Sequence, residues 1–474
     1  MPKHGALAAL VASLLVAGSA AAQPYTNGDV VVFFGDSITH GGRYHQYIAD
    51  YYRTRFPESS IRFVNSGIGG DTAAGAYGRI PEDVAEYKPT HVTFHFGMND
   101  IGRGHYLPEA STESIVGREE AQARYRVNLP KLIAAVREVA PNAKFTYLTP
   151  TPYEDTATVT NAPKTGWASY NNFGCNAGLS LMAGFVVASA GRDKADCVDW
   201  YSVLNNFRVR HQKEDPHFTI VRPDRVHPEE LGHAIMAWEF LKRQGVPSVV
   251  SEVEIDAKGG KVTNAENGEV SGLKVEGIAA DAASAGRTGV AFDLLAKALP
   301  FPVHEKARPY LKEFDVENTL NRETVRVTGL AAGVYALRID GAEVGRYAAE
   351  ELAKGVGLGF NEKTPQYRQA QEIAARHCEL REREAVLRNH HSARWAFSGR
   401  APVDDVAAFR DWYEKDLKAG GKRANSYFGK FIPGYLEYWP KYREVRAKLW
   451  EDQEAVRKLA KPVAHRYDIV KIER

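Results

Sequence analysis

The sequence predicts an α/β domain with a mostly parallel sheet, followed by a β-rich accessory unit and a helical C-terminal region. Three stretches of the 474 residues differ in pattern and support this prediction. Over residues 28–248, short apolar runs alternate with helical segments, which indicates a three-layer sandwich with helices on both faces of the sheet. Over residues 249–355, apolar and polar residues alternate between glycine turns. Residues 356–474 are rich in Glu, Lys and Arg and favour helices.

The elements expected in the first domain follow from these runs. Short β-branched or aromatic runs are typical of buried strands, and we expect strands at residues 30–34, 61–64, 91–96 and 144–148. Helical periodicity lies between and after them, and we expect helices at 44–55, up to 87, 121–139 with an interruption near Pro130, around 185–189, and 231–244.

The second half of the chain predicts two further kinds of structure. Period-two alternation predicts antiparallel strands at residues 251–256, 261–264, 268–275, 324–328 and 334–339. A short apolar helix is expected at 290–299, and a closing strand at 467–472 that returns to a sheet. Between them, residues 364–459 favour a small helical bundle. Its aromatic cluster would be either a sugar-stacking platform or, as is more common for such residues, the core of that bundle. The members of the cluster are Tyr427, Phe428, Phe431, Tyr435, Tyr438, Trp439 and Tyr442.

The first 22 residues have the pattern of a signal peptide. Lys3 and His4 precede an apolar run at residues 6–16, and the small residues Ala20 and Ala22 fit a cleavage site before residue 23. A buried N-terminal helix is the alternative interpretation. The apolar run is too short for a membrane span, which needs about 18 apolar residues, so no stable membrane insertion is expected. We therefore expect a protein exported to the periplasm or the extracellular space.

Composition and spacing also argue against several partners and cofactors. The 61 Lys and Arg residues nearly balance the 59 Asp and Glu residues, so a nucleic-acid partner is not expected. His91 and His95 share one face of a strand but have no acidic or cysteine neighbour spaced for zinc, and no metal or other cofactor is expected. Cys175 and Cys197 could pair in an oxidising compartment, and the sequence leaves this pairing open. Cys378 is expected to be a buried thiol.

Ser37 stands directly after the first expected strand, where open α/β sheets place their sites. A serine at this position is either a nucleophile or the N-cap of the next helix. A nucleophilic serine needs a base that is itself oriented by a third group. Asp224 and His227 lie three positions apart in a loop, so the carboxylate could hold the Nδ1–H of the imidazole while Nε2 faces outward. A solvated loop before a helix is the alternative interpretation of this segment.

Two more segments could stabilise an oxyanion. The glycine-rich run at residues 67–70 follows the second strand and allows a backbone N–H to approach a reacting carbon closely. Asn99 follows the third strand and places an amide side chain at the same edge of the sheet. Each segment alone would more often be a glycine turn or a helix cap. Their occurrence at the ends of successive strands favours a catalytic site.

Taken together, the motifs of residues 29–245 resemble those of the SGNH hydrolase family, the GDSL-type esterases and lipases. Gly35-Asp36-Ser37 matches the first motif block, Ile68-Gly69-Gly70-Asp71-Thr72 the second, Gly97-Met98-Asn99-Asp100 the third and Asp224-Arg225-Val226-His227 the last. The resemblance implies a flavodoxin-like fold and the catalytic residues Ser37, His227 and Asp224. It also implies an oxyanion hole formed by Ser37, Gly70 and Asn99, with Gly69 the less favoured glycine. Asp36 and Asp100 would hold turns in place.

The resemblance further implies a metal-independent serine esterase that hydrolyses carboxylic esters, and the N-terminal pattern adds the expectation that it is exported. A small-molecule or glycan ester is the expected substrate, and removal of acetyl groups from a carbohydrate is the favoured reaction. A lipid ester hydrolase such as a lysophospholipase or thioesterase is the alternative within this class. A non-catalytic glycan-binding protein on the same fold is the alternative from a different class. Neither the natural acyl group nor the oligomeric state follows from the sequence.

Overall fold

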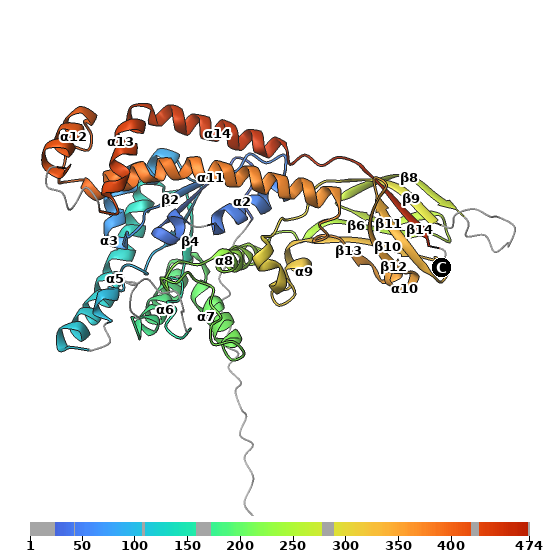
Figure 1. Cartoon of the computed structure of the whole chain (residues 1–474), viewed down its shortest axis with the longest axis horizontal. Coiled ribbons are helices and arrows are strands. Elements are labelled where there is room, and N and C mark those ends of the chain that lie inside the picture. The colour runs from blue at the N-terminus through green and yellow to red at the C-terminus, as the bar shows by residue number, and fades with distance from the viewer. Residues whose placement is uncertain are drawn as a thin grey trace, which may run out of the picture.

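A computed structural model describes residues 24–41, 43–106, 110–157, 172–276, 289–418 and 426–472. The predicted signal peptide at residues 1–22 lies outside the described residues. Figure 1 shows an elongated molecule in which the α/β domain occupies one end and β6 to β12 the other. The long helices α11 (Pro365–Phe397) and α14 (Tyr442–Lys458) run along the α/β domain.

The α/β domain is built on a five-stranded parallel sheet with the strand order β2-β1-β3-β4-β5. Its strands are β1 (Val30–Gly35), β2 (Arg62–Gly67), β3 (His91–His95), β4 (Lys144–Leu148) and β5 (Asp196–Val198). This is the flavodoxin-like order, in which the strand order reverses between β1 and β3 and opens a crevice at the carboxyl ends of these two strands. The predicted α/β fold class is therefore confirmed.

The main helices of this domain are α2 (Tyr44–Arg55), α5 (Thr112–Val139), α6 (Cys175–Asp193), α7 (Trp200–His211) and α8 (Glu230–Arg243). The expected break of α5 near Pro130 was wrong, because the helix continues through this residue. A proline inside a helix removes one backbone hydrogen bond. Buried side chains on both sides of it, including Tyr125 and Leu132, keep the helix against the domain.

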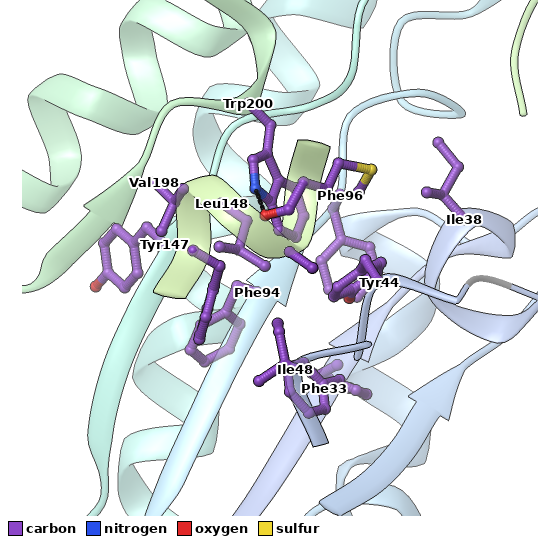
Figure 2. Packing of buried hydrophobic residues seen from close by; sticks show 14 of the residues in the cluster. Phe33, Ile38, Tyr44, Ile48, Phe94, Phe96, Tyr147, Leu148, Val198 and Trp200 are labelled. Atoms are coloured by element: carbon purple, nitrogen blue, oxygen red, sulfur yellow. Dashed lines mark hydrogen bonds between the residues drawn. The ribbon is translucent and has the colours of Figure 1, made fainter. Parts of the chain in front are cut away.

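The core of the α/β domain is dominated by aromatic side chains (Figure 2). Trp200 lies 4.8 Å from the ring of Tyr44 and 5.0 Å from that of His95, and its Nε1–H donates to the Met236 carbonyl at 2.9 Å. Burial lowers the pKa of His95 to about 3, so this histidine is a neutral core residue. Among the described residues, no cluster of His, Cys, Asp or Glu could hold a metal ion.

Residues 249–348 form most of a two-sheet β unit. One sheet has the order β13-β10-β6-β7 and the other β12-β11-β14-β9-β8. The pairing is mostly antiparallel as expected, although β6 and β10 pair in parallel. The strands are β6 (Val249–Asp256), β7 (Lys261–Glu266), β8 (Gly268–Glu276), β9 (Gly289–Ala296), β10 (Arg322–Thr328), β11 (Val334–Ile339), β12 (Ala342–Ala348), β13 (Val356–Gly357) and β14 (His465–Lys471).

The helix expected at residues 290–299 was wrong, since this segment is strand β9. Val290, Phe292 and Leu294 alternate with more exposed residues and point into the core between the two sheets. A short apolar run does not by itself distinguish a helix from a strand, and here the partners on either side, β8 and β14, decide. The closing strand β14 does return to a sheet, as expected. Both β13 and β14 come from the range assigned to the helical region.

The helical region packs on the edge of the α/β domain that contains β2. Helix α11 contacts α2 and β2 as well as α14 and α13 (Ile432–Tyr438). Figure 1 shows α12 (Val406–Trp412) and α13 at the end of the molecule far from the β unit. None of the helices in the described ranges combines the length and the apolar character that a membrane span requires.

The three cysteines all lie in described segments, and all three are free thiols. Burial raises the pKa of both Cys175 and Cys197 to about 12. Because the thiolate is the reactive form, a raised pKa lowers the reactivity of both thiols near neutral pH.

We therefore expect three titratable thiols in the protein when it is denatured without a reducing agent. Ellman's reagent measures this number, and a Cys378→Ser variant should give two. A single thiol in the wild-type protein, and none in the variant, would instead show that Cys175 and Cys197 are paired.

Candidate active site

Ser37 occupies the first position of the short helix α1 (Ser37–His40), and a single residue, Asp36, separates it from the end of β1. The N-cap of this helix is Asp36, whose Oδ1 accepts a hydrogen bond from the Ile38 N–H at 2.9 Å. Burial raises the pKa of Asp36 to about 6. Since Asp36 fulfils the capping role, the Ser37 hydroxyl is not the helix cap and is free to interact elsewhere.

The Ser37 hydroxyl meets the loop that precedes α8, although the two lie 190 positions apart. Ser37 Oγ and His227 Nε2 are 2.8 Å apart, and His227 Nδ1 lies 2.6 Å from Asp224 Oδ2. With the Nδ1–H donating to the carboxylate, Nε2 accepts the hydroxyl proton of the serine. This is the geometry that a serine nucleophile, its base and the orienting acid require.

Asp224 is held as a carboxylate by the same loop. Its Oδ1 accepts the N–H groups of Val226 and His227, each at 3.0 Å. Burial opposes its ionisation, but the hydrogen bonds from His227 outweigh this effect and lower the pKa of Asp224 to about 2. The side chains of Asp224 and His227 are 21% and 25% exposed, so the imidazole can be reached from solvent.

The glycine-rich run at residues 67–70, called the glycine loop below, lies beside Ser37. A Cβ added to Gly67 would lie 2.1 Å from the backbone nitrogen of His40, so only glycine allows α1 to pack on this strand end. Gly70 has a φ of +80°, a conformation that disfavours other residues. The Gly69 N–H donates to His40 Nδ1 at 3.2 Å, and burial lowers the pKa of His40 to about 3, which keeps this acceptor neutral. These contacts fix the loop that carries the predicted donor Gly70.

The Asn99 amide is oriented on both sides. Its Nδ2 donates one hydrogen to the Asp71 carbonyl at 2.8 Å, and its Oδ1 accepts from the guanidinium of Arg103 at 3.4 Å. The second Nδ2 hydrogen can be donated to a substrate oxygen. Sequence reasoning missed Arg103, which also donates to the Met98 carbonyl. Its position four residues after Asn99 was the available signal.

A buried arginine holds the first two strand ends together. Arg79 donates to the carbonyls of Gly35 at 2.9 Å and of Ser66 at 2.7 Å, and to the carboxylates of Asp71 at 2.7 Å and Asp83 at 2.5 Å. Arg79 thus links the strand before Ser37 to the loop that contains Gly70. A single arginine in a short helical segment carries no such signal in the sequence, and we did not predict it.

Helix α11 completes this ionic cluster from the helical region. Arg388 donates to both oxygens of Asp83, at 2.8 and 3.1 Å, and to the Gly67 carbonyl at 3.1 Å. Burial opposes the ionisation of Asp83, but Arg388, His391 and Arg79 outweigh it and hold the pKa of Asp83 well below its usual range. The cluster is therefore charged, and it joins α11 to the backbone of the glycine loop.

Comparison with known proteins agrees with this geometry. Residues 33–235 match the GDSL-like lipase/acylhydrolase family. The α/β domain of this chain belongs to that family. The chain therefore contains an acylhydrolase domain of the GDSL type, and the resemblance seen in its motifs is confirmed.

Two proteins that are similar to this chain match very different shares of it. An acetylxylan esterase from Geobacillus stearothermophilus is 35% identical over 97 residues, which cover 17% of this chain and 44% of that protein. The match thus spans less than half the length of this curated relative. The structure of a gut microbial diltiazem-metabolizing enzyme covers 96% of this chain and 100% of its own, with a TM-score of 0.80 and 28% identity. The arrangement of GDSL domain, β unit and helical region is therefore shared with that enzyme.

The ionic cluster makes Arg388 a positioning residue for the GDSL domain. We expect Arg388→Met to lower kcat and to destabilise the protein by about 3 kcal/mol, because it removes one of the two guanidinium groups that compensate the buried Asp83 carboxylate. Arg383→Met is the matched control on the same helix, where Arg383 pairs with Asp452 in an exposed position and should contribute less than about 1 kcal/mol. Urea unfolding and steady-state ester hydrolysis measure the two effects. Equal stability of the two variants would contradict this role.

Asp100 makes a separate, pH-dependent contribution to stability. Its Oδ1 accepts the Ala73 N–H at 3.0 Å, and burial raises its pKa to about 7. The folded state therefore holds this proton more tightly than the unfolded state, and the contribution of Asp100 to stability is lost as the pH rises from about 4 to about 7. In an Asp100→Asn variant this contribution is absent, so the melting temperature of the wild type relative to that of the variant should fall over the same range. An equal change in melting temperature for the two proteins between these pH values would contradict the prediction.

Proposed function

We propose that this protein is an exported serine esterase that removes acetyl groups from a carbohydrate. The observation that carries the proposal is the hydrogen-bonded chain from Ser37 through His227 to Asp224, beside the N–H groups of the glycine loop. The family of the α/β domain, named for lipases and acylhydrolases, supports the reaction class.

In the proposed mechanism, His227 Nε2 accepts the proton of Ser37 as its oxygen attacks the acyl carbon. Asp224 keeps the imidazole oriented and stabilises the imidazolium that forms. The negative charge that develops on the carbonyl oxygen is met by the N–H groups of Ser37 and Gly70 and by the Asn99 amide. His227 then protonates the leaving alcohol, and water hydrolyses the acyl-enzyme by the same route.

Two observations support the finer parts of the proposal. The curated relative that matches a part of this chain is described as an acetylxylan esterase, which favours acetylated carbohydrate as the substrate class. The basic, apolar and small-residue pattern of residues 1–22 supports export to the periplasm or the extracellular space.

Replacement of the nucleophile tests this function directly. We expect Ser37→Ala to abolish acetate release from acetylated xylan or pectin, because no other hydroxyl is hydrogen-bonded to His227 Nε2 in the described residues. Ser202→Ala, an exposed serine in α7, is the matched control and should retain wild-type activity. Acetate is quantified enzymatically after incubation with each polymer.

Two results would contradict the proposal. Acetate release by Ser37→Ala at near wild-type rates would exclude the serine mechanism. A wild-type enzyme that prefers long-chain acyl esters to acetyl esters would leave the mechanism intact and overturn the assignment to carbohydrate deacetylation.

A further inference from the structure

The aromatic cluster of the helical region is for the most part a packed core, the alternative expected from the sequence. Tyr435 and Tyr442 are buried, and the rings of Tyr435, Trp439 and Tyr442 each stack on His390 at 4.7 to 5.1 Å. Tyr427 is the exception, with 55% of its surface exposed. The exposed ring therefore needs a separate explanation.

Tyr427 and the next residue lie against the glycine loop of the GDSL domain. A Cβ added to Gly69 would be 2.8 Å from the Tyr427 hydroxyl and 3.3 Å from its Cε1. A Cβ added to Gly70 would be 3.6 Å from Cζ of Phe428. Tyr427 and Phe428 thus stand next to the backbone N–H that is proposed to bind the oxyanion, although more than 350 residues separate them in the sequence.

The position of Tyr427 is held by other rings and by the GDSL domain. Tyr427 meets Phe428 and Phe431 edge to face, with centroids 5.0 and 5.2 Å apart. Phe428 packs on Trp395 of α11 at 5.5 Å, and the Trp395 Nε1–H donates to the Gly75 carbonyl at 3.2 Å. Because neighbouring rings hold it in place while more than half of its surface is exposed, Tyr427 has ring surface available to a bound ligand.

We propose that Tyr427 is a specificity-determining residue that packs against a ring in the alcohol part of the ester. This inference rests on the proposed deacetylase function. An acetyl group has only a methyl beyond its carbonyl carbon, so a ring that contacts Tyr427 must belong to the alcohol. A sugar ring presents C–H groups on its faces, and these pack on an aromatic face in the same way as other apolar surfaces. The helical region thereby contributes to the substrate site of the GDSL domain.

The test compares two acetyl esters that differ in their alcohols, a peracetylated methyl xyloside with a ring and ethyl acetate without one. We expect Tyr427→Ala to raise KM for the xyloside by about fivefold, the size of one aromatic contact, while kcat changes less than twofold. Hydrolysis of ethyl acetate should stay within twofold of wild type. Tyr427→Phe should behave as wild type, since it keeps the ring. Tyr438→Ala, in the same helical region, is the matched control.

A second measurement separates binding from catalysis. In the Ser37→Ala background, Tyr427→Ala should weaken binding of the same xyloside by a similar factor in calorimetry. A loss of kcat/KM on both esters would overturn the proposal, because Tyr427 would then act by positioning the glycine loop. Unchanged KM for the xyloside would also overturn it, and so would a selective effect on ethyl benzoate, which carries its ring on the acyl side.

The proposed function has its own control in this experiment. Ethyl acetate hydrolysis by the wild type, and its loss in Ser37→Ala, establishes the esterase reaction without any ring contact. If the wild type hydrolyses neither ester, the deacetylase function fails and the role of Tyr427 fails with it. If ethyl acetate hydrolysis depends on Ser37 and only the Tyr427 effects are missing, the specificity role alone is wrong.

Discussion

The active site depends on the buried ionic cluster formed by Arg79, Asp83 and Arg388. Burial of three charges is costly unless each is paired and hydrogen-bonded, and here the two guanidinium groups share the Asp83 carboxylate. Their remaining N–H groups donate to the carbonyls of Gly35, Ser66 and Gly67, which end the strands β1 and β2. The cluster therefore fixes the two backbone segments from which Ser37 and Gly70 follow.

The helical region is consequently part of the catalytic unit rather than a separate appendage. Arg388 reaches the glycine loop from α11, and Tyr427 and Phe428 stand beside the same loop. The acetylxylan esterase that resembles this chain matches only a part of it, whereas the diltiazem-metabolizing enzyme matches nearly the whole chain. A GDSL domain without such a helical region would lack these contacts to the glycine loop.

The accuracy of sequence interpretation varied with the kind of contact that holds each element. Four of the five strands of the parallel sheet were recognised, because each contains a short group of β-branched or aromatic residues that a local pattern reveals. The segment at residues 290–299 is equally apolar, but its neighbours in the sheet come from residues 268–276 and 465–471, and a local pattern does not contain them. Helix α5 begins nine residues before the expected start. Its N-terminus is set by the Ser111 capping box, and its first turns contain few apolar residues that would reveal a helix in the sequence.

By itself the sequence determined the fold class of the first domain and the residues of the candidate site, because each motif block is local and its side chains belong to one strand end or one loop. It did not reveal which residues hold those blocks in place. Ser37 and His227 are 190 positions apart, and Arg388 and Asp83 are 305 apart. Only the tertiary structure decided that Arg79, Arg103, Arg388 and Tyr427 lie at this site, since hydrogen bonding and packing between such distant residues depend on how the strands and helices are arranged in space.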